Sequence, residues 1–251
     1  MQALKVDIAD NIKIIIDSND SNDSKDSKDS NGNSFELTLH HALEFLVKKS
    51  KMSTKPSKRG KAAVITDVLK QKEMFFSSLT KLLCRKGILA QGAIQLFGNL
   101  ASPKSKVQDA IRDCGAIEAL MQLLFRKDQE DTVQREILEA LSNIVHDNYK
   151  NQERIRKSER IPDLVQLLQI MEVRGPAADA IRRMYERNPS NQKAFAEAGA
   201  ITSFTKLLAD PVVNSAGQQQ DLTSHAFLQA LGTVLIYSLR KIEAIKAKYL
   251  N

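Results

Sequence analysis

DTVQREILEALSNIVHDN, from Asp131 to Asn148, is the stretch that decides the fold. Its apolar residues recur three or four positions apart, which is the period of an α-helix and not of a strand. They make one stripe: Val133, Ile137, Leu138, Leu141, Ile144 and Val145. The sequence therefore predicts an amphipathic helix with one buried face.

This helix is the last part of a unit that recurs along the chain. An apolar helix that ends in a Leu-Leu pair, GAIEALMQLLF, precedes it, and a shorter segment, VQDAIRDC, comes before that. Leu-Leu pairs stand at Leu82-Leu83, Leu123-Leu124, Leu167-Leu168 and Leu207-Leu208, at steps of 41, 44 and 40 residues. Helical units of this length stack on one another, because one unit cannot cover its own apolar face. We expect an α-solenoid.

The unit resembles an armadillo repeat in pattern as well as in length. The order Asn-x-x-Asn-Lys/Gln, Gly-Ala-Ile, Leu-Leu and Ala-Leu-Ser-Asn-Ile is similar to that family's repeat, and its clearest copy runs from Ser102 to Asp147. Other copies run from Asn148 to Asn188 and onward from NPSNQKAF, and an incomplete one contains SSLTKLLCR. The resemblance covers about Lys72 to Leu239 and implies an all-α, right-handed α-α superhelix of about four repeats.

Two features distinguish individual copies. Gly115 and Gly199 stand at the sharp corner between the first and second helices, where a positive φ angle is commonly needed. The middle copy has Arg160 there, so we expect that corner to be built differently. The last copy carries an insertion, DPVVNSAGQQQD, which we expect to form a polar surface loop. We expect residues 237–251 to complete the final helix and to cover the exposed end of the repeats.

We expect three parts in the chain. Residues 62–251 form the repeat domain, residues 35–61 a capping helix and a basic linker, and residues 1–34 an N-terminal segment. Within that segment, residues 1–16 suit a strand or a helix equally. Residues 17–34 contain no apolar side chain and place Asp at every third position, so they cannot bury a core and should be disordered. A calcium loop would need Glu where Thr38 stands.

The net charge of +7 comes from one short segment. Residues 48–61 hold seven basic side chains and no acidic one, so the rest of the chain is neutral. The seven are Lys48, Lys49, Lys51, Lys55, Lys58, Arg59 and Lys61. A nucleic-acid groove needs a distributed basic face, so we do not expect one along the repeats. Binding of nucleic acid or of an acidic membrane through residues 48–61 remains the alternative function.

No pattern of catalytic or metal-binding residues stands out. Cys84 and Cys114 have neither a second Cys nor a His at ligand spacing, and His40 and His41 point about 100° apart on a helix. We therefore expect a noncatalytic protein without metal or cofactor. The chain shows neither a signal peptide nor an apolar run of membrane-spanning length, so we expect it in the cytoplasm or the nucleus.

The candidate site lies on the third helices of the repeats. In the armadillo family these helices line a concave groove, where an Asn often holds the backbone of an extended peptide. Asn99 and Asn143 match that position, and Arg183 and Thr233 occupy it in the next two copies. One turn earlier stand Gln95, Glu139, Asp179 and Gln229.

The resemblance thus implies a scaffold or adaptor whose partner is an extended segment or a helix of another protein. A carboxamide can bond both a backbone N–H and a C=O, which suits this role, with Asn143 as the central anchor. A structural helix cap is the other reading of each Asn. Import adaptors of the family carry Trp one turn earlier, and this chain has no Trp, which argues against that particular role.

Overall fold

The structure, a computed structural model, describes residues 2–17, 32–51, 58–85, 87–209, 232 and 236. Every regular element in those ranges is a helix, which agrees with the predicted all-α class. The chain forms two compact units, Met1–Leu123 and Leu124–Asn251.

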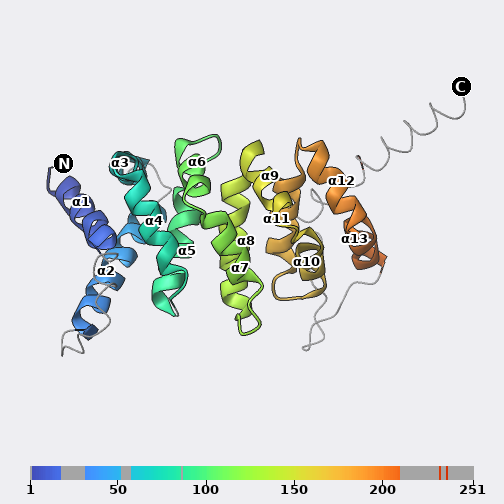
Figure 1. Cartoon of the computed structure of the whole chain (residues 1–251), viewed down its shortest axis with the longest axis horizontal. Coiled ribbons are helices and arrows are strands. Elements are labelled where there is room, and N and C mark those ends of the chain that lie inside the picture. Colours follow the sequence, from blue (N-terminus) through green and yellow to red (C-terminus); the bar gives the residue numbers. More distant parts are fainter. Residues whose placement is uncertain are drawn as a thin grey trace, which may run out of the picture. The chain divides into compact units, whose positions relative to one another are not determined.

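The first unit begins with two helices that come before the predicted repeats (Figure 1). Its helices are α1 (Gln2–Asp17), α2 (Gly32–Lys51), α3 (Lys58–Lys70), α4 (Lys72–Leu82), α5 (Ile88–Leu100), α6 (Lys106–Asp113) and α7 (Ala116–Leu124), which ends at the boundary. α1 packs against α2, α3 and α4, and its Ile8, Ile12 and Ile15 are fully buried at helical spacing. The N-terminal stretch that suited a strand or a helix is therefore a helix.

α2 packs along α5, the third helix of the first repeat. A Cβ atom on Gly92 of α5 would lie only 3.2 Å from the Cβ atom of Leu43, so glycine permits this close approach. Both ends of the predicted basic linker are helical, since Lys51 ends α2 and Lys58 begins α3. α2 thus packs on the first repeat in the way a preceding third helix would.

The second unit continues the same three-helix pattern. Its helices are α8 (Asp131–Val145), α9 (Tyr149–Lys157), α10 (Ile161–Gln166), the 3-10 helix η2 (Leu167–Gln169), α11 (Arg174–Tyr185), α12 (Pro189–Glu197) and α13 (Ala200–Ala209). α8 packs along α11. The stripe predicted on α8 is its buried face, with only Val133 half-exposed. The third helix predicted for the last repeat lies outside the described residues, apart from 232 and 236, as do the insertion and the C-terminal cap.

The turn from a third helix into the next first helix has the same backbone in two copies. Asp147 and Arg187 each have φ of 55°, in the left-handed region. The next residues, Asn148 (φ −121°, ψ 93°) and Asn188 (φ −124°, ψ 93°), are extended and cap the following helices. Each Asn Oδ1 accepts a hydrogen bond from the backbone N–H three residues on, which satisfies a donor left open at the helix start.

The corner between the first and second helices contains a left-handed residue in three copies. Gly115 and Gly199 have φ of 77° and 84°, as their place in the repeat predicts. In the middle copy Glu159 has φ of 58°, and Arg160 follows it as the cap of α10. That corner thus keeps a left-handed residue but differs from the other two at Arg160 (φ −97°), which stands between the left-handed residue and the second helix.

Candidate functional site

The contact between α8 and α11 carries four of the predicted groove residues. Glu139 and Asn143 are one turn apart on α8, and Asp179 and Arg183 are one turn apart on α11, so each pair shares a helix face. Glu139 is exposed, and the other three are half-buried. This row of polar side chains, Glu139, Asn143, Asp179 and Arg183, is called the polar row below.

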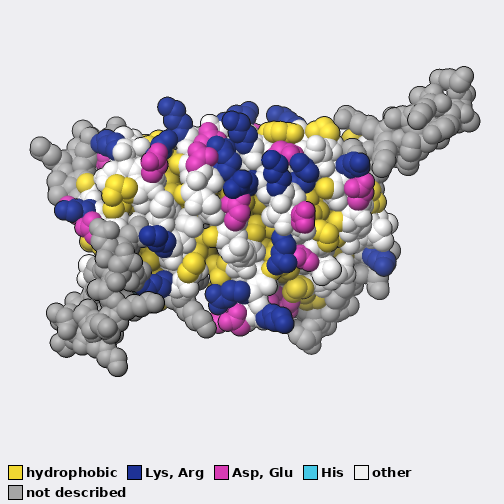
Figure 2. Space-filling view, viewed as in Figure 1, with side chains coloured by type: hydrophobic (Ala, Val, Ile, Leu, Met, Phe, Trp, Pro, Cys, Tyr) yellow, Lys and Arg dark blue, Asp and Glu magenta, His cyan; other side chains and the backbone are white. Residues whose placement is uncertain are grey.

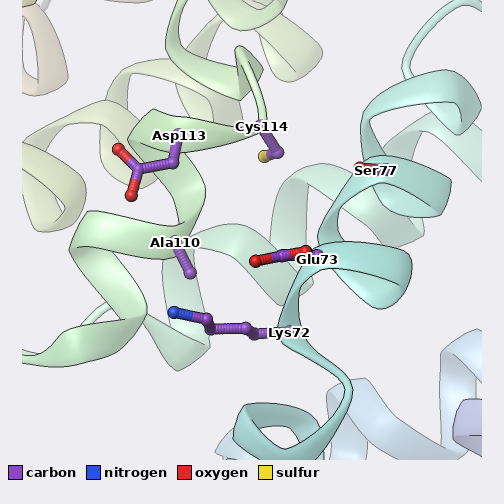
Figure 3. Close-up of a pocket in the computed structure, with 6 residues that line it drawn as sticks. All are labelled: Lys72, Glu73, Ser77, Ala110, Asp113 and Cys114. Carbon is purple, nitrogen blue, oxygen red and sulfur yellow. The ribbon is translucent and has the colours of Figure 1, made fainter.

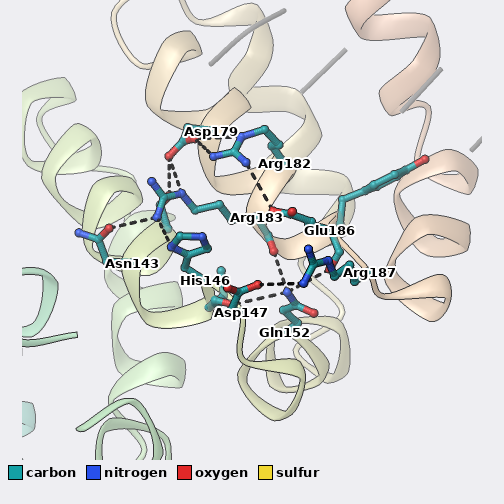
Figure 4. A network of polar contacts seen from close by, with 12 residues as sticks. Asn143, His146, Asp147, Gln152, Asp179, Arg182, Arg183, Glu186 and Arg187 are labelled. Carbon is teal, nitrogen blue, oxygen red and sulfur yellow. Dashed lines mark hydrogen bonds and ion pairs between the residues drawn. The ribbon is translucent and has the colours of Figure 1, made fainter. Parts of the chain in front are cut away.

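Asp179 is the centre of the contacts in the polar row (Figure 4). Its Oδ2 accepts a hydrogen bond of 2.6 Å from Ser142 Oγ and lies 3.0 Å from Arg183 Nε, and its Oδ1 accepts one of 2.7 Å from Arg182 Nη2. Burial alone would raise the pKa of Asp179, but the bonds from Ser142 and Arg182 and the two positive charges lower it overall. The carboxylate therefore stays charged and ties α8 to α11.

Arg183 reaches back from α11 to α8. Its Nη1 donates to Asn143 Oδ1 at 3.4 Å and to His146 Nδ1 at 2.9 Å. Partial burial, together with the charge of Arg183, lowers the pKa of His146, which keeps the ring neutral and its Nδ1 able to accept. Asn143, predicted as the central anchor, thus already shares its oxygen with Arg183.

In the first unit, α5 carries the other two described groove residues. Gln95 Oε1 accepts a hydrogen bond of 3.2 Å from Lys51 Nζ of α2. The side-chain Nδ2 of Asn99 is buried and has no hydrogen-bond partner among the residues that the structure describes. Gln229 and Thr233 lie outside the described residues. The predicted groove residues are thus brought together in two groups, one in each unit.

The basic segment is only partly described. Lys48 is exposed in α2, and Lys49 Nζ lies 5.3 Å from the centre of the Phe45 ring. Lys58, Arg59 and Lys61 are in the first turn of α3, and Lys55 lies outside the described residues. Figure 2 shows Lys and Arg interspersed with Asp and Glu on one face of the molecule. That face of the described residues is mixed in sign.

Sequence reasoning missed a set of buried amides between successive repeats. Asn151 Nδ2 donates to the Ile144 carbonyl at 2.9 Å, and Asn191 Nδ2 donates to the Met184 carbonyl at 2.8 Å. Both carbonyls belong to the last turn of a third helix, where no intrahelical donor remains. The signal was the Asn-x-x-Asn motif, whose first Asn caps the first helix and whose second holds the helix before it.

A pocket of about 180 Å³ lies between α4 and α6 in the first unit (Figure 3). Its lining residues are Lys72, Glu73, Ser77, Ala110, Asp113 and Cys114. Burial raises the pKa of the Cys114 thiol, and its Sγ donates to the Ile111 carbonyl at 3.1 Å. A protonated thiol is a poor nucleophile, so this lining does not assemble a nucleophilic centre.

Two features are absent from the part of the chain that the structure describes. Within them, no three His, Cys, Asp or Glu side chains are grouped so as to hold a metal ion. Over the same residues, no helix has both the length and the apolar character needed to cross a membrane.

The family comparison matches the second of the predicted repeats. The family model described as Armadillo/beta-catenin-like repeat matches residues 104–146, which run from the turn before α6 to the residue after α8. The chain carries an armadillo repeat. The resemblance to the armadillo family is thereby confirmed on the copy that the sequence shows most clearly.

Solved structures extend the armadillo likeness over most of the chain. An engineered protein is 21% identical with a TM-score of 0.59, over 91% of this chain and 96% of that one. A designed armadillo repeat protein in complex with peptide (KR)4 is 19% identical with a TM-score of 0.57, over 90% and 99%. A second engineered protein is 23% identical with a TM-score of 0.55, over 80% of this chain, which spans only 50% of that protein.

At these identities the structures show the fold alone, and it is the predicted all-α armadillo solenoid. No curated protein matches this chain.

Proposed function

We propose that the chain is a noncatalytic scaffold that binds an extended segment of a partner protein along its third helices. The observation that carries this proposal is the polar row on α8 and α11. Its side chains are partly exposed, yet Asp179 and Arg183 are held by contacts that join the two helices. A fixed array of donors and acceptors loses little conformational entropy when a partner binds, which favours recognition of a backbone.

Asn99 in the first unit supports the same function. Its buried Nδ2 has no hydrogen bond within the described residues, and an unmet donor of this kind costs about 1–3 kcal/mol. Because Nδ2 is enclosed, a partner carbonyl oxygen would remove that cost only if neighbouring side chains moved aside as the partner bound. The designed armadillo repeat protein in complex with peptide (KR)4 is a precedent for peptide binding on this fold.

Photocrosslinking tests the surface directly. A photoreactive residue would replace Glu139 in the polar row or, as a control, Gln166, which is exposed on α10. After irradiation in a lysate of the source cell, partner adducts should form at position 139 and be absent at position 166. Asn143→Ala should weaken capture of those partners about fivefold to tenfold, as expected for the loss of one hydrogen-bonding group. Equal adducts at both positions would reject the polar row as the binding surface.

A further inference from the structure

The guanidinium of Arg183 is held from three directions before any partner arrives. Nε pairs with Asp179 Oδ2 at 3.0 Å, and Nη1 contacts both Asn143 Oδ1 at 3.4 Å and His146 Nδ1 at 2.9 Å. Two of these partners stand on or just after α8, and one on α11 (Figure 4). The backbone is held too, since the Arg183 carbonyl accepts a hydrogen bond of 2.8 Å from Gln152 Nε2. The orientation of this side chain is therefore set by the fold.

One nitrogen of the same guanidinium, Nη2, is left for a partner. None of the contacts of Arg183 within the described residues involves Nη2, and that atom is not enclosed by the protein. The side chain as a whole is 22% exposed. Nη2 keeps its two N–H donors, and a carboxylate oxygen can accept a charge-assisted hydrogen bond from it, so this nitrogen suits a carboxylate.

The side chains around Arg183 carry charges of both signs. Asp179 is shared between Arg182 and Arg183, because its two oxygens contact both guanidinium groups. Glu186 contacts Arg182, at 3.5 Å, and has no contact with Arg183 within the described part of the chain. A carboxylate would therefore be bound by its direct contact with Nη2 of Arg183 and not by an excess of positive charge around it. A phosphate would bring nearly two negative charges close to Asp179 and Glu139, and is disfavoured.

We propose that Arg183 selects an Asp or Glu side chain in the partner segment. This inference rests on the proposed function, because it names the partner chemistry at the same surface. Arg183 occupies the position that Asn99 and Asn143 occupy in the preceding third helices. At this position a carboxamide, which can bind a partner backbone, is therefore replaced by a guanidinium, which can bind an acidic side chain. The polar row then recognises backbone at Asn143 and one acidic side chain at Arg183.

Selection from a peptide library tests the inference on the whole chain. A displayed library of random peptides would be selected on the wild-type protein, and the best binders would be measured in solution by fluorescence polarisation. Each Asp or Glu of a binder would then be changed to Asn or Gln. We expect one such change to weaken binding to the wild type about tenfold, the size expected for a charged hydrogen-bonded pair.

Variants of the protein locate the effect. In Arg183→Gln, the same peptide change should matter less than about twofold, because the pair is already broken. Arg183→Lys keeps the charge without the planar guanidinium that the fold holds in place, and should give an intermediate loss, which covers the case in which Arg183→Gln fails to fold. Arg187→Gln is the matched control: it removes an equal charge from the end of the same helix, at a side chain that is 78% exposed, and should respond like the wild type.

The outcomes separate the two proposals. If no peptide from the library binds the wild type, the proposed function fails and the inference fails with it. If peptides bind but no acidic residue is sensitive to Arg183, the inference alone is overturned. Sensitivity that is equal in Arg183→Gln and Arg187→Gln would also overturn it, since the effect would then come from net charge.

Discussion

The cap residue Asn188 should contribute more to stability than its counterpart Asn148, and a set of four variants tests this. Both side chains accept a hydrogen bond from the backbone N–H three residues on, at 3.1 Å and 3.2 Å. Asn188 is fully buried, and its Nδ2 also donates to Gln152 Oε1 of α9 at 3.2 Å. Asn148 is half-buried. The two sites share a backbone conformation and differ in burial, because water can reach the half-buried Asn148 but not the fully buried Asn188.

The contacts give the expected magnitudes. Removing a cap costs about 1 kcal/mol, so Asn148→Ala should lower the free energy of unfolding by about that amount. Asn188→Ala should cost about 2–4 kcal/mol, because it also leaves a buried oxygen of Gln152 without its donor. Serine caps a helix about as well as asparagine, and water can replace other side-chain contacts at the half-buried position 148, so Asn148→Ser should cost less than Asn188→Ser. Asn188→Ser keeps the cap but loses the donor and should cost about 1–3 kcal/mol.

Urea unfolding followed by far-UV circular dichroism measures these differences. All four substitutions lie in the second unit, so their midpoints can be compared directly when the dependence on urea concentration is unchanged. Equal losses for Asn188→Ser and Asn148→Ser would refute the reasoning, since the bond from Asn188 to Gln152 would then add nothing.

Three other substitutions test separate parts of the structure. Glu159→Gly should raise the thermal midpoint, because glycine adopts the left-handed backbone of this residue without strain, and the free energy of unfolding should rise by up to about 1 kcal/mol. Gly199→Ala should lower the midpoint for the same reason. Shifts of the same sign would contradict the argument from the φ angles. Asp179→Asn should destabilise the chain at neutral pH, because folding lowers the pKa of Asp179 and a lowered pKa adds stability above the ordinary Asp value of about 4. The difference in unfolding free energy between wild type and variant should shrink as pH falls through the lower folded pKa. A difference that stays constant with pH in urea titrations would argue against this role. Leu141→Ala should cost about 2–5 kcal/mol because Leu141 is fully buried, whereas Glu139→Ala at an exposed site should change unfolding by less than about 0.5 kcal/mol.

Local periodicity was enough to predict much of the fold. The apolar stripe on α8 could be predicted because apolar residues recur at every turn of the helix, and this spacing can be recognised in the sequence without knowledge of tertiary contacts. The helical structure of α1 could not be predicted, because LKVDI and IKIII suit a strand as well as a helix. Packing of Ile8, Ile12 and Ile15 against the helices that follow decides between them. The corner at Glu159 was missed because a glutamate does not reveal a positive φ angle.

The candidate site shows where sequence reasoning stops. Counting along the repeat placed Asn143 and Arg183 at equivalent positions, but equivalence does not say that they touch. Their contact depends on how closely α8 approaches α11, which is a property of packing between residues far apart in the chain. The positions of the polar row were predictable, and the pairing that holds Arg183 in place was not.

The matching turns at Asp147-Asn148 and Arg187-Asn188 make the stretch between them an interchangeable module. Residues 148–187 begin just after one left-handed residue and end on the next, so both joints demand the same pair of backbone conformations. A second copy of this 40-residue segment could be inserted at either joint, because the backbone conformations that the inserted turn needs already occur at both joints. The array could thus lengthen by whole modules, each bringing another first, second and third helix and another place on the polar row.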